Sequence, residues 1–147
     1  MHTWIRTLAC ALVLATGAPL AGAAATTGGM TLEQVAQTRA VTQAQISPDG
    51  QEVAYILSVP RTLGVDPDGP ARTELHVADR NSNSRGFIIG KVDVASPRWL
   101  PDGQRVAYLS KREGDETRGL YTIPLRGGES TRVAKLAGDI TSFDLSP

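Results

Sequence analysis

The sequence predicts an all-β protein built from repeated four-stranded units, as in an incomplete β-propeller. Three observations predict this fold class. Short apolar or alternating runs recur at intervals of roughly ten residues from Val41 onward, as in sheet proteins. A turn followed by a strand occurs twice, as "SPDGQEVAY" and "LPDGQRVAY", and Pro48 and Pro101 of these turns are 53 residues apart. With 15 glycines and 9 prolines in 147 residues, the composition favours short strands joined by turns over long helices.

The first 23 residues are expected to be a secretory signal peptide. Arg6 supplies a positive n-region, Leu8–Ala15 a short apolar core, and Ala21-Gly22-Ala23 the small residues that signal peptidase accepts. The apolar run is far below the roughly 20 residues of a membrane span. We therefore expect cleavage after Ala23 or Ala25 and export to the periplasm or the medium, the alternative being an uncleaved N-terminal anchor. The single cysteine, Cys10, lies in this segment, so the mature chain would hold no disulfide and no cysteine metal site.

Residues 24–40 are expected to form a flexible leader and one short helix. "AATTGG" has the composition of a flexible segment, and "MTLEQVAQTRA" follows it. Thr31 with Gln34 three residues later has the spacing of a capping box, which predicts a helix from Leu32 to about Thr38. The alternative is a frayed turn, because so short a helix depends on tertiary contacts.

The strands are expected to group into blades. They are predicted at Val41–Ile46, Glu52–Leu57, Glu74–Asp79, Arg85–Gly90, Val92–Trp99, Arg105–Ser110, Leu120–Leu125, Thr131–Leu136 and Ile140–Leu145. Apart from an insertion before Glu74, the repeat is about 45 residues with four strands, which is typical of a propeller blade. We place blade one at about 41–91, blade two at about 92–138 and the first strand of a third at 139–147. Because propellers have four to eight blades, we expect a truncated piece of a longer protein. The alternatives are a small open sheet, or a ring closed by oligomerisation.

Both repeated turns have the residues that their geometry requires. Proline fixes φ for the second position of a type I turn, aspartate suits the third, and glycine takes the following left-handed position at no steric cost. We therefore predict structural turns at two triplets: Pro48, Asp49 and Gly50; and Pro101, Asp102 and Gly103.

The sequence shows no recognisable catalytic site. The sequence contains no G-x-S-x-G nucleophile motif, no phosphate-binding glycine loop and, beyond the signal segment, only His76 among histidines. No metal site and no cofactor are expected. Three arginines are expected in the loops between the second and third strands of the blades: Arg61, Arg72 and Arg112. They are candidates for binding a substrate carboxylate through two hydrogen bonds. The formal net charge of zero gives no indication of nucleic-acid binding.

Two segments resemble a known family. "MTLEQVAQTRAVTQAQISPDGQEVAYILSVPR" resembles the start of mature bacterial peptidases of the prolyl oligopeptidase family, in its dipeptidyl-aminopeptidase and acylaminoacyl-peptidase-like branch. "PRWLPDGQRVAYLSKREGDETRGLYTIPLRGGES" is similar to the propeller blades of that family. The resemblance covers Met30 to Pro147.

This resemblance implies an N-terminal propeller that gates peptide access to a C-terminal α/β-hydrolase domain with a Ser-Asp-His triad. None of the triad lies in the matched part, so we expect this chain alone to be inert and the parent protein to be a serine peptidase. Its partners would be that hydrolase domain and peptide substrates. The chain has no adjacent Glu pair of the kind aminopeptidase relatives use to hold the substrate amine. Two alternatives stay open: a periplasmic binding propeller of the Tol-system type, and a degraded reading frame.

Overall fold

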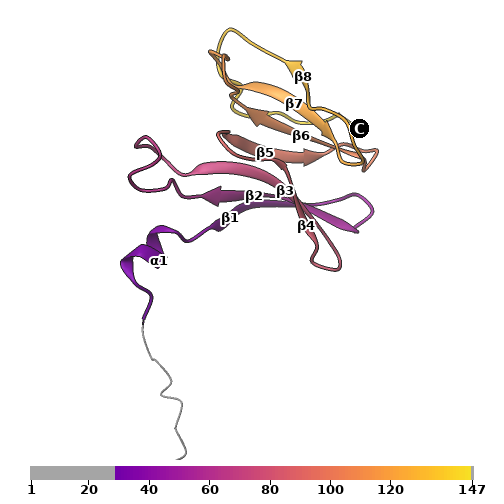
Figure 1. Ribbon diagram of the computed structural model, residues 1–147. Helices are drawn as coiled ribbons and strands as arrows, with labels where there is room; N and C mark the ends of the chain where they lie inside the picture. Colours follow the sequence, from indigo (N-terminus) through magenta and orange to yellow (C-terminus); the bar gives the residue numbers. More distant parts are fainter. Residues whose placement is uncertain (1–28, 147) are drawn as a thin grey trace, which may run out of the picture.

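The computed structural model describes residues 29–146, and these residues form an all-β structure with one short helix (Figure 1). The expected signal peptide lies outside the described residues. The elements are α1 (Leu32–Ala36), β1 (Ala40–Ile46), β2 (Glu52–Val59), β3 (Arg72–Asp79), β4 (Ser84–Ile88), β5 (Val94–Trp99), β6 (Arg105–Ser110), β7 (Gly119–Pro124) and β8 (Thr131–Ala134). Strands β1–β4 form one antiparallel sheet and β5–β8 a second, each in sequential order. Each sheet is therefore a four-stranded meander.

The short helix has the cap that its sequence predicts. The Thr31 hydroxyl accepts from the Gln34 backbone N–H, and the Gln34 side chain accepts from the Thr31 N–H, which completes the capping box. The helix ends at Ala36, two residues before the expected end, and none of its residues is buried. Because α1 buries no side chain, its N-terminus is stabilised mainly by the hydrogen bonds of the capping box.

The two proline-containing turns close the first hairpin of each sheet. Gly50 N–H donates to Ser47 O and Gly103 N–H to Leu100 O, both over 2.9 Å, and both glycines have positive φ (68° and 63°). A carboxylate braces each turn, because Asp49 accepts from the Gln51 N–H and Asp102 from the Gln104 N–H. The turns therefore direct β2 and β6 back along β1 and β5.

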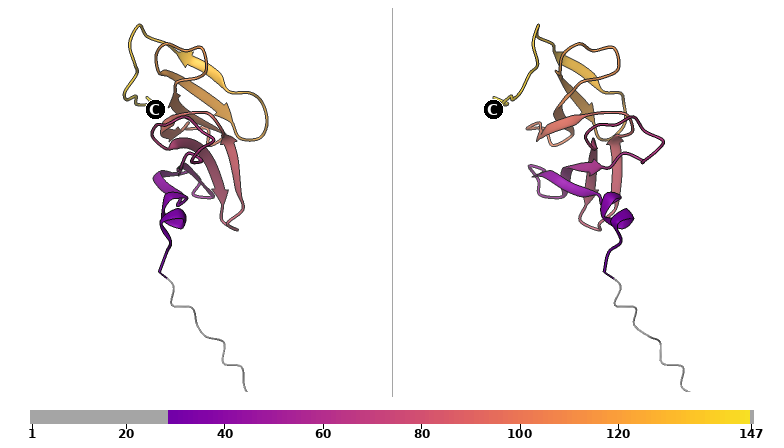
Figure 2. Two further views of the ribbon diagram at one scale, coloured as in Figure 1. Left: turned by 60° about the vertical axis from the view of Figure 1, so that its left-hand side comes forward. Right: turned by 90° about the vertical axis from the view of Figure 1, so that its left-hand side faces the viewer.

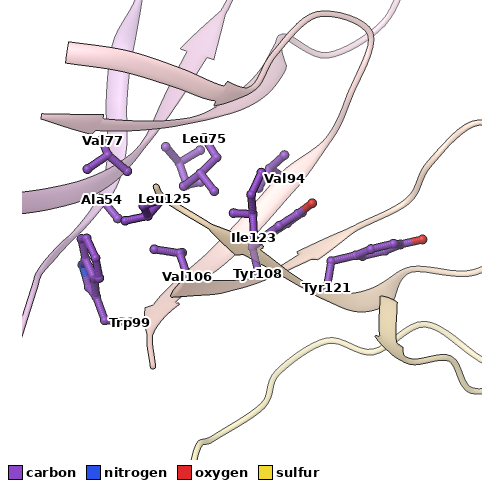
Figure 3. Packing of buried hydrophobic residues seen from close by; sticks show 11 residues of the cluster. Ala54, Leu75, Val77, Val94, Trp99, Val106, Tyr108, Tyr121, Ile123 and Leu125 are labelled. Carbon is purple, nitrogen blue, oxygen red and sulfur yellow. The ribbon is translucent and has the colours of Figure 1, made fainter. Parts of the chain in front are cut away.

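The core lies between the two sheets, which stack face to face (Figures 1 and 2). Strand β5 packs against β1, β2 and β3 of the first sheet. The buried cluster between the sheets contains Ala54, Ile56, Leu75, Val77, Val94, Trp99, Val106, Tyr108, Tyr121, Ile123 and Leu125 (Figure 3). Trp99 Nε1 donates to Gln45 O over 2.9 Å, so a hydrogen bond as well as apolar contact joins the sheets. Successive side chains of a strand point to opposite faces of its sheet. Alternate residues of β2 and β6, such as Ala54 and Val106, therefore point into the shared core.

Each sheet carries a stacked pair of aromatic rings on its second and third strands. Tyr55 stacks on His76 with ring centroids 5.5 Å apart, and Tyr108 stacks on Tyr121 with centroids 5.8 Å apart. These pairs occupy matching places, since Tyr55 and Tyr108 follow the two turns at the same distance. In the second sheet the pair is buried against the first sheet, whereas Tyr55 and His76 are only half-buried. The equivalent face of the first sheet is therefore less covered than that of the second sheet within residues 29–146.

Residues 139–146 contain no strand, so the expectation of a ninth strand at Ile140–Leu145 was wrong. A strand needs a partner for its backbone groups, and residues 29–146 include no further strand to pair with this segment. The segment nevertheless begins as β5 does. Ile140 N–H donates to Arg118 O beside β7, much as Val94 N–H donates to the Thr73 hydroxyl beside β3.

Candidate functional site

A pocket of about 260 Å³ lies at one end of the sheets, and we call it the basic pocket. It is lined by Arg61, Pro67, Arg72, Lys91, Val92, Asp93 and Lys111. These residues come from the β2–β3 loop, the start of β3, the β4–β5 connection and the residue after β6. The pocket thus forms where both sheets send their loops to the same end.

Arg61 lies in the β2–β3 loop, whereas Arg72, which was expected in a loop, is the first residue of β3 and pairs with Val59. Arg61 Nε donates to Pro70 O over 2.8 Å and Nη1 donates to Pro67 O over 3.3 Å, so its guanidinium spans the loop. Arg72 forms an ion pair with Asp66. Asp66 also accepts from the Thr62 N–H, and this hydrogen bond, followed by Arg72, lowers the pKa of the Asp66 carboxyl. The loop is therefore braced by its own charged side chains.

Asp93 anchors the other wall of the basic pocket. Its Oδ1 accepts from the Thr73 hydroxyl over 2.7 Å, and its Oδ2 accepts from Arg118 Nη2 over 2.8 Å. Thr73 and Asp93 also form a parallel β-bridge, which joins the start of β3 to the entry of β5. The Asp93 carboxylate is thus used for positioning the junction between the sheets.

Of the three arginines that the sequence suggested, two line the basic pocket and one does not. Arg61 and Arg72 face it together, while Arg112 lies over the Tyr121 ring, 4.2 Å from its centroid. Arg112 Nη2 also donates to the Tyr108 hydroxyl over 2.8 Å. Its contacts in residues 29–146 are those of a residue that packs the second sheet.

The turn residues lie elsewhere, in a separate surface hollow. Pro48, Asp49, Pro101, Asp102 and Gly103 line this hollow with Gln104 and Arg126. An alanine Cβ placed on Gly103 would lie 3.9 Å from Pro48 Cδ, so the two turns are in near contact. Gly50 lies in the same turn as Asp49, where the Arg80 side chain donates to its carbonyl.

Sequence reasoning missed Lys91, Asp93 and Lys111 as pocket residues. They are separated from Arg61 by 30, 32 and 50 positions, and they lie in two other connections between strands, Lys91 and Asp93 in one and Lys111 in the next. No period or motif marks such residues. The blade repeat was the one feature of the sequence that could have indicated them, because it predicts that loops of successive sheets meet at one end.

The described residues hold no arrangement for nucleophilic catalysis. His76 Nε2 lies 3.1 Å from Glu74 Oε2, and no serine hydroxyl within residues 29–146 is hydrogen-bonded to this imidazole. Nor do three or more His, Cys, Asp or Glu side chains gather there as metal ligands do. The part of the chain in the structure also has no helix long and apolar enough to cross a membrane. What the basic pocket can do chemically is attract and hold an anionic group.

Comparison with known proteins relates the chain to peptidases. No family model matches it. It is 32% identical to dipeptidyl-peptidase 5 of Porphyromonas endodontalis over 99 residues, which are 67% of this chain and 14% of that protein. It is 28% identical to the uncharacterized peptidase YuxL of Bacillus subtilis over 118 residues, 80% of this chain and 17% of the relative. A Tol-Pal system protein TolB of Francisella tularensis is 30% identical over 76 residues, 50% of this chain and 17% of the relative.

The matched lengths limit what these similarities cover. The chain spans 14 to 17% of the length of these relatives. Two of the three are peptidases by name, and the match to YuxL extends over most of the chain. The chain is therefore related to peptidases through a segment that is a small part of their length.

Proposed function

We propose that this chain is the N-terminal, non-catalytic part of a β-propeller in an exported serine peptidase of the prolyl oligopeptidase family. In this proposal the propeller limits which peptides reach a hydrolase domain that carries the catalytic serine. The observation that carries it is the sequence relation to two peptidases, together with the resemblance of the opening segment to that family. The whole enzyme's activity on peptides belongs to the proposal.

The fold supports the propeller. Two consecutive four-stranded meanders stack face to face, which is how blades pack in a propeller. The Tyr55 face of the first sheet is partly exposed, whereas the second sheet buries its equivalent face. A repeating stack of this kind is stable only when each unit has neighbours. We infer that another blade covers the Tyr55 face in the full-length protein.

The β2–β3 loop, residues 60–71, supports a role in substrate selection. It projects from the end of the first sheet, and the side chains of Leu63 and Val65 are 83% and 79% exposed. Loops on a rigid sheet scaffold commonly carry recognition. An exposed apolar pair on a braced loop suits contact with a peptide or with the hydrolase domain.

The test uses the full-length gene product and a loop variant. Leu63→Ser with Val65→Ser should leave hydrolysis of a dipeptidyl substrate close to wild type. The same variant should change the ratio of kcat/KM for a longer peptide to kcat/KM for that dipeptidyl substrate. Val133→Ser, on exposed β8, is the matched control. A gene product with no peptidase activity on any peptide would refute the proposal.

A second candidate is a binding propeller of the Tol-system type, because two TolB proteins match about half of the chain. The coding sequence after Pro147 separates the two. A G-x-S-x-G motif followed by aspartate and histidine favours the peptidase, whereas further blades and then a stop codon favour the binding protein.

Export is part of the proposal and rests on the signal-like composition of residues 1–23. N-terminal sequencing of the protein recovered from its host tests it. The expected mature N-terminus follows Ala23 or Ala25, and a mature protein that retains Arg6 and the Leu8–Ala15 run would contradict a cleaved signal.

A further inference from the structure

We infer that the basic pocket binds the carboxylate group of a peptide. The choice of a peptide as ligand rests on the proposed function, whereas the affinity for a carboxylate rests on the pocket itself. The ligand is a single anionic group that enters between Arg61, Lys91 and Lys111.

The charges of the basic pocket do not cancel. Arg72 is paired with Asp66, and Asp93 is paired with Arg118. No carboxylate within residues 29–146 forms an ion pair with Arg61, Lys91 or Lys111. Three positive charges at one small opening create a local potential that attracts an anion, even though the chain as a whole has no net charge.

Arg61 is held in place without a ligand. Two backbone carbonyls of its own loop fix Nε and Nη1, which leaves Nη2 with no hydrogen-bond partner in the part of the chain described. The guanidinium also packs on Gly69, where an added Cβ would lie 3.1 Å from Nε. A donor that is already positioned loses little conformational freedom when it binds, so its hydrogen bond contributes more to affinity.

The size and lining of the basic pocket favour a small anionic group as its ligand. Its volume of about 260 Å³ is below the roughly 300–1,000 Å³ of sites that enclose a drug-sized molecule, so it takes a group rather than a whole peptide. No aromatic side chain lines it, which argues against a nucleotide base stacked in it. A carboxylate suits a guanidinium flanked by two lysines, because it accepts several charge-assisted hydrogen bonds.

The experiment is calorimetric titration of the full-length protein with blocked peptides. The probes are N-acetyl-trialanine with a free carboxylate, its C-terminal amide, the amide of N-acetyl-Ala-Glu-Ala, and inorganic phosphate. We expect the free carboxylate of trialanine to bind at least about tenfold more tightly than the amide, since the amide lacks the charge. If the glutamyl peptide binds and trialanine does not, the site recognises acidic side chains. If trialanine binds and the glutamyl peptide does not, the site recognises the C-terminal carboxylate of a peptide. Either supports a carboxylate site, whereas binding of phosphate without either peptide overturns it.

Variants assign the binding to the basic pocket. Lys91→Gln with Lys111→Gln should weaken carboxylate binding by roughly tenfold, as expected for two partly screened charges. Gly69→Ala should weaken it too, because the added methyl crowds the Arg61 guanidinium and the φ of 157° at this position strains an alanine in the same loop. Lys135→Gln, an exposed lysine outside the pocket, is the control and should bind as wild type. Equal affinities in the wild type and the double variant would overturn the inference.

The outcomes separate this inference from the proposed function. Carboxylate binding that depends on Lys91 and Lys111, in a protein without peptidase activity, would support the pocket and refute the peptidase. A peptidase whose carboxylate binding is unchanged by the double variant would do the reverse.

Discussion

Asp115 holds the β6–β7 loop through several side chains at once. It accepts from the Tyr121 hydroxyl, and its Oδ1 accepts from Arg132 Nη1 over 2.8 Å. The Tyr121 hydrogen bond is the main cause of the lowered pKa of the Asp115 carboxyl. Burial, followed by Asp115, raises the pKa of Tyr121 further above its ordinary value of 10.0. A single carboxylate thereby ties a core tyrosine to a surface loop.

Tyr121→Phe should lower the free energy of unfolding by about 1–2 kcal/mol, because a hydrogen bond to a charged acceptor is lost while the buried ring is kept. Urea denaturation at pH 7 measures the change. Tyr55→Phe, which removes an exposed bond to Ser84, is the matched control and should cost less. Equal losses in the two variants would contradict this account of Asp115.

Acid should destabilise the protein. Five carboxyls have a pKa below their ordinary value of 3.8, namely Asp49, Asp66, Asp79, Asp102 and Asp115. Backbone N–H groups, hydroxyls and side-chain donors stabilise their charged forms only in the folded state. A lowered folded-state pKa adds stability above the unfolded value and loses it as pH falls through the folded value. We expect a stability plateau above about pH 5 and a decline below about pH 4. Denaturation curves from about pH 7 down to about pH 3 measure it, and unchanged stability at about pH 3 would contradict it.

Among the elements, the turns depend most on residue type. Gly103 has φ of 63°, and an alanine Cβ there meets no atom closer than 3.9 Å, so substitution strains only the backbone. Gly103→Ala should therefore cost about 1 kcal/mol. Gly138→Ala is the control, because Gly138 has no neighbour within 4 Å and no left-handed φ. Thermal denaturation compares the two, and a Gly103 variant as stable as the control would contradict a backbone origin.

Elements with local signals were predicted well from the sequence. The helix start follows from Thr31 and Gln34, and eight of the nine expected strands follow from short alternating runs between Gly- and Pro-containing turns. These features depend on neighbours a few residues apart, which is the range that sequence patterns report. The ninth strand was wrong because a strand also needs a pairing partner, which no local pattern guarantees.

The candidate site was predicted only in part, because its residues are distant in sequence. Arg61 and Arg72 were suggested from the sequence because both lie close to the connection between β2 and β3. Lys91 and Lys111 follow different strands, and nothing in their immediate sequence differs from a solvated surface lysine. Arg112 lies outside the basic pocket, and its contacts with two tyrosines could not be foreseen because they form only when β6 and β7 are paired.

In the molecule as a whole, the two sheets differ in what covers their equivalent faces. Ile46 and Trp99 hold matching places before the two turns, and their side chains are 69% and 9% exposed. Trp99 is covered by the first sheet. Ile46 has the same orientation relative to its own sheet, because it pairs with Val53 as Trp99 pairs with Val106.

Ile46→Asp should lower the melting temperature of the full-length gene product, because the proposed neighbouring blade would bury the new charge at that place. Val133→Asp is the control, since exposed Val133 lies on β8 at the far edge of its sheet. Differential scanning calorimetry compares the two variants. A full-length protein that tolerates both equally would contradict a blade on the Tyr55 face.

Because its indole donates a hydrogen bond to Gln45 across the sheets, Trp99 is also an intrinsic fluorescence probe of their contact. The chain has two tryptophans, Trp4 and Trp99; Trp99 lies at the junction of the sheets, and Trp4 lies outside the described residues. In this chain, once Trp4 is removed with the expected signal peptide or replaced by phenylalanine, Trp99 alone contributes indole emission. Loosening of the sheets would let solvent reach the ring and shift its emission to longer wavelength, so their separation can be followed in a fluorimeter without a dye.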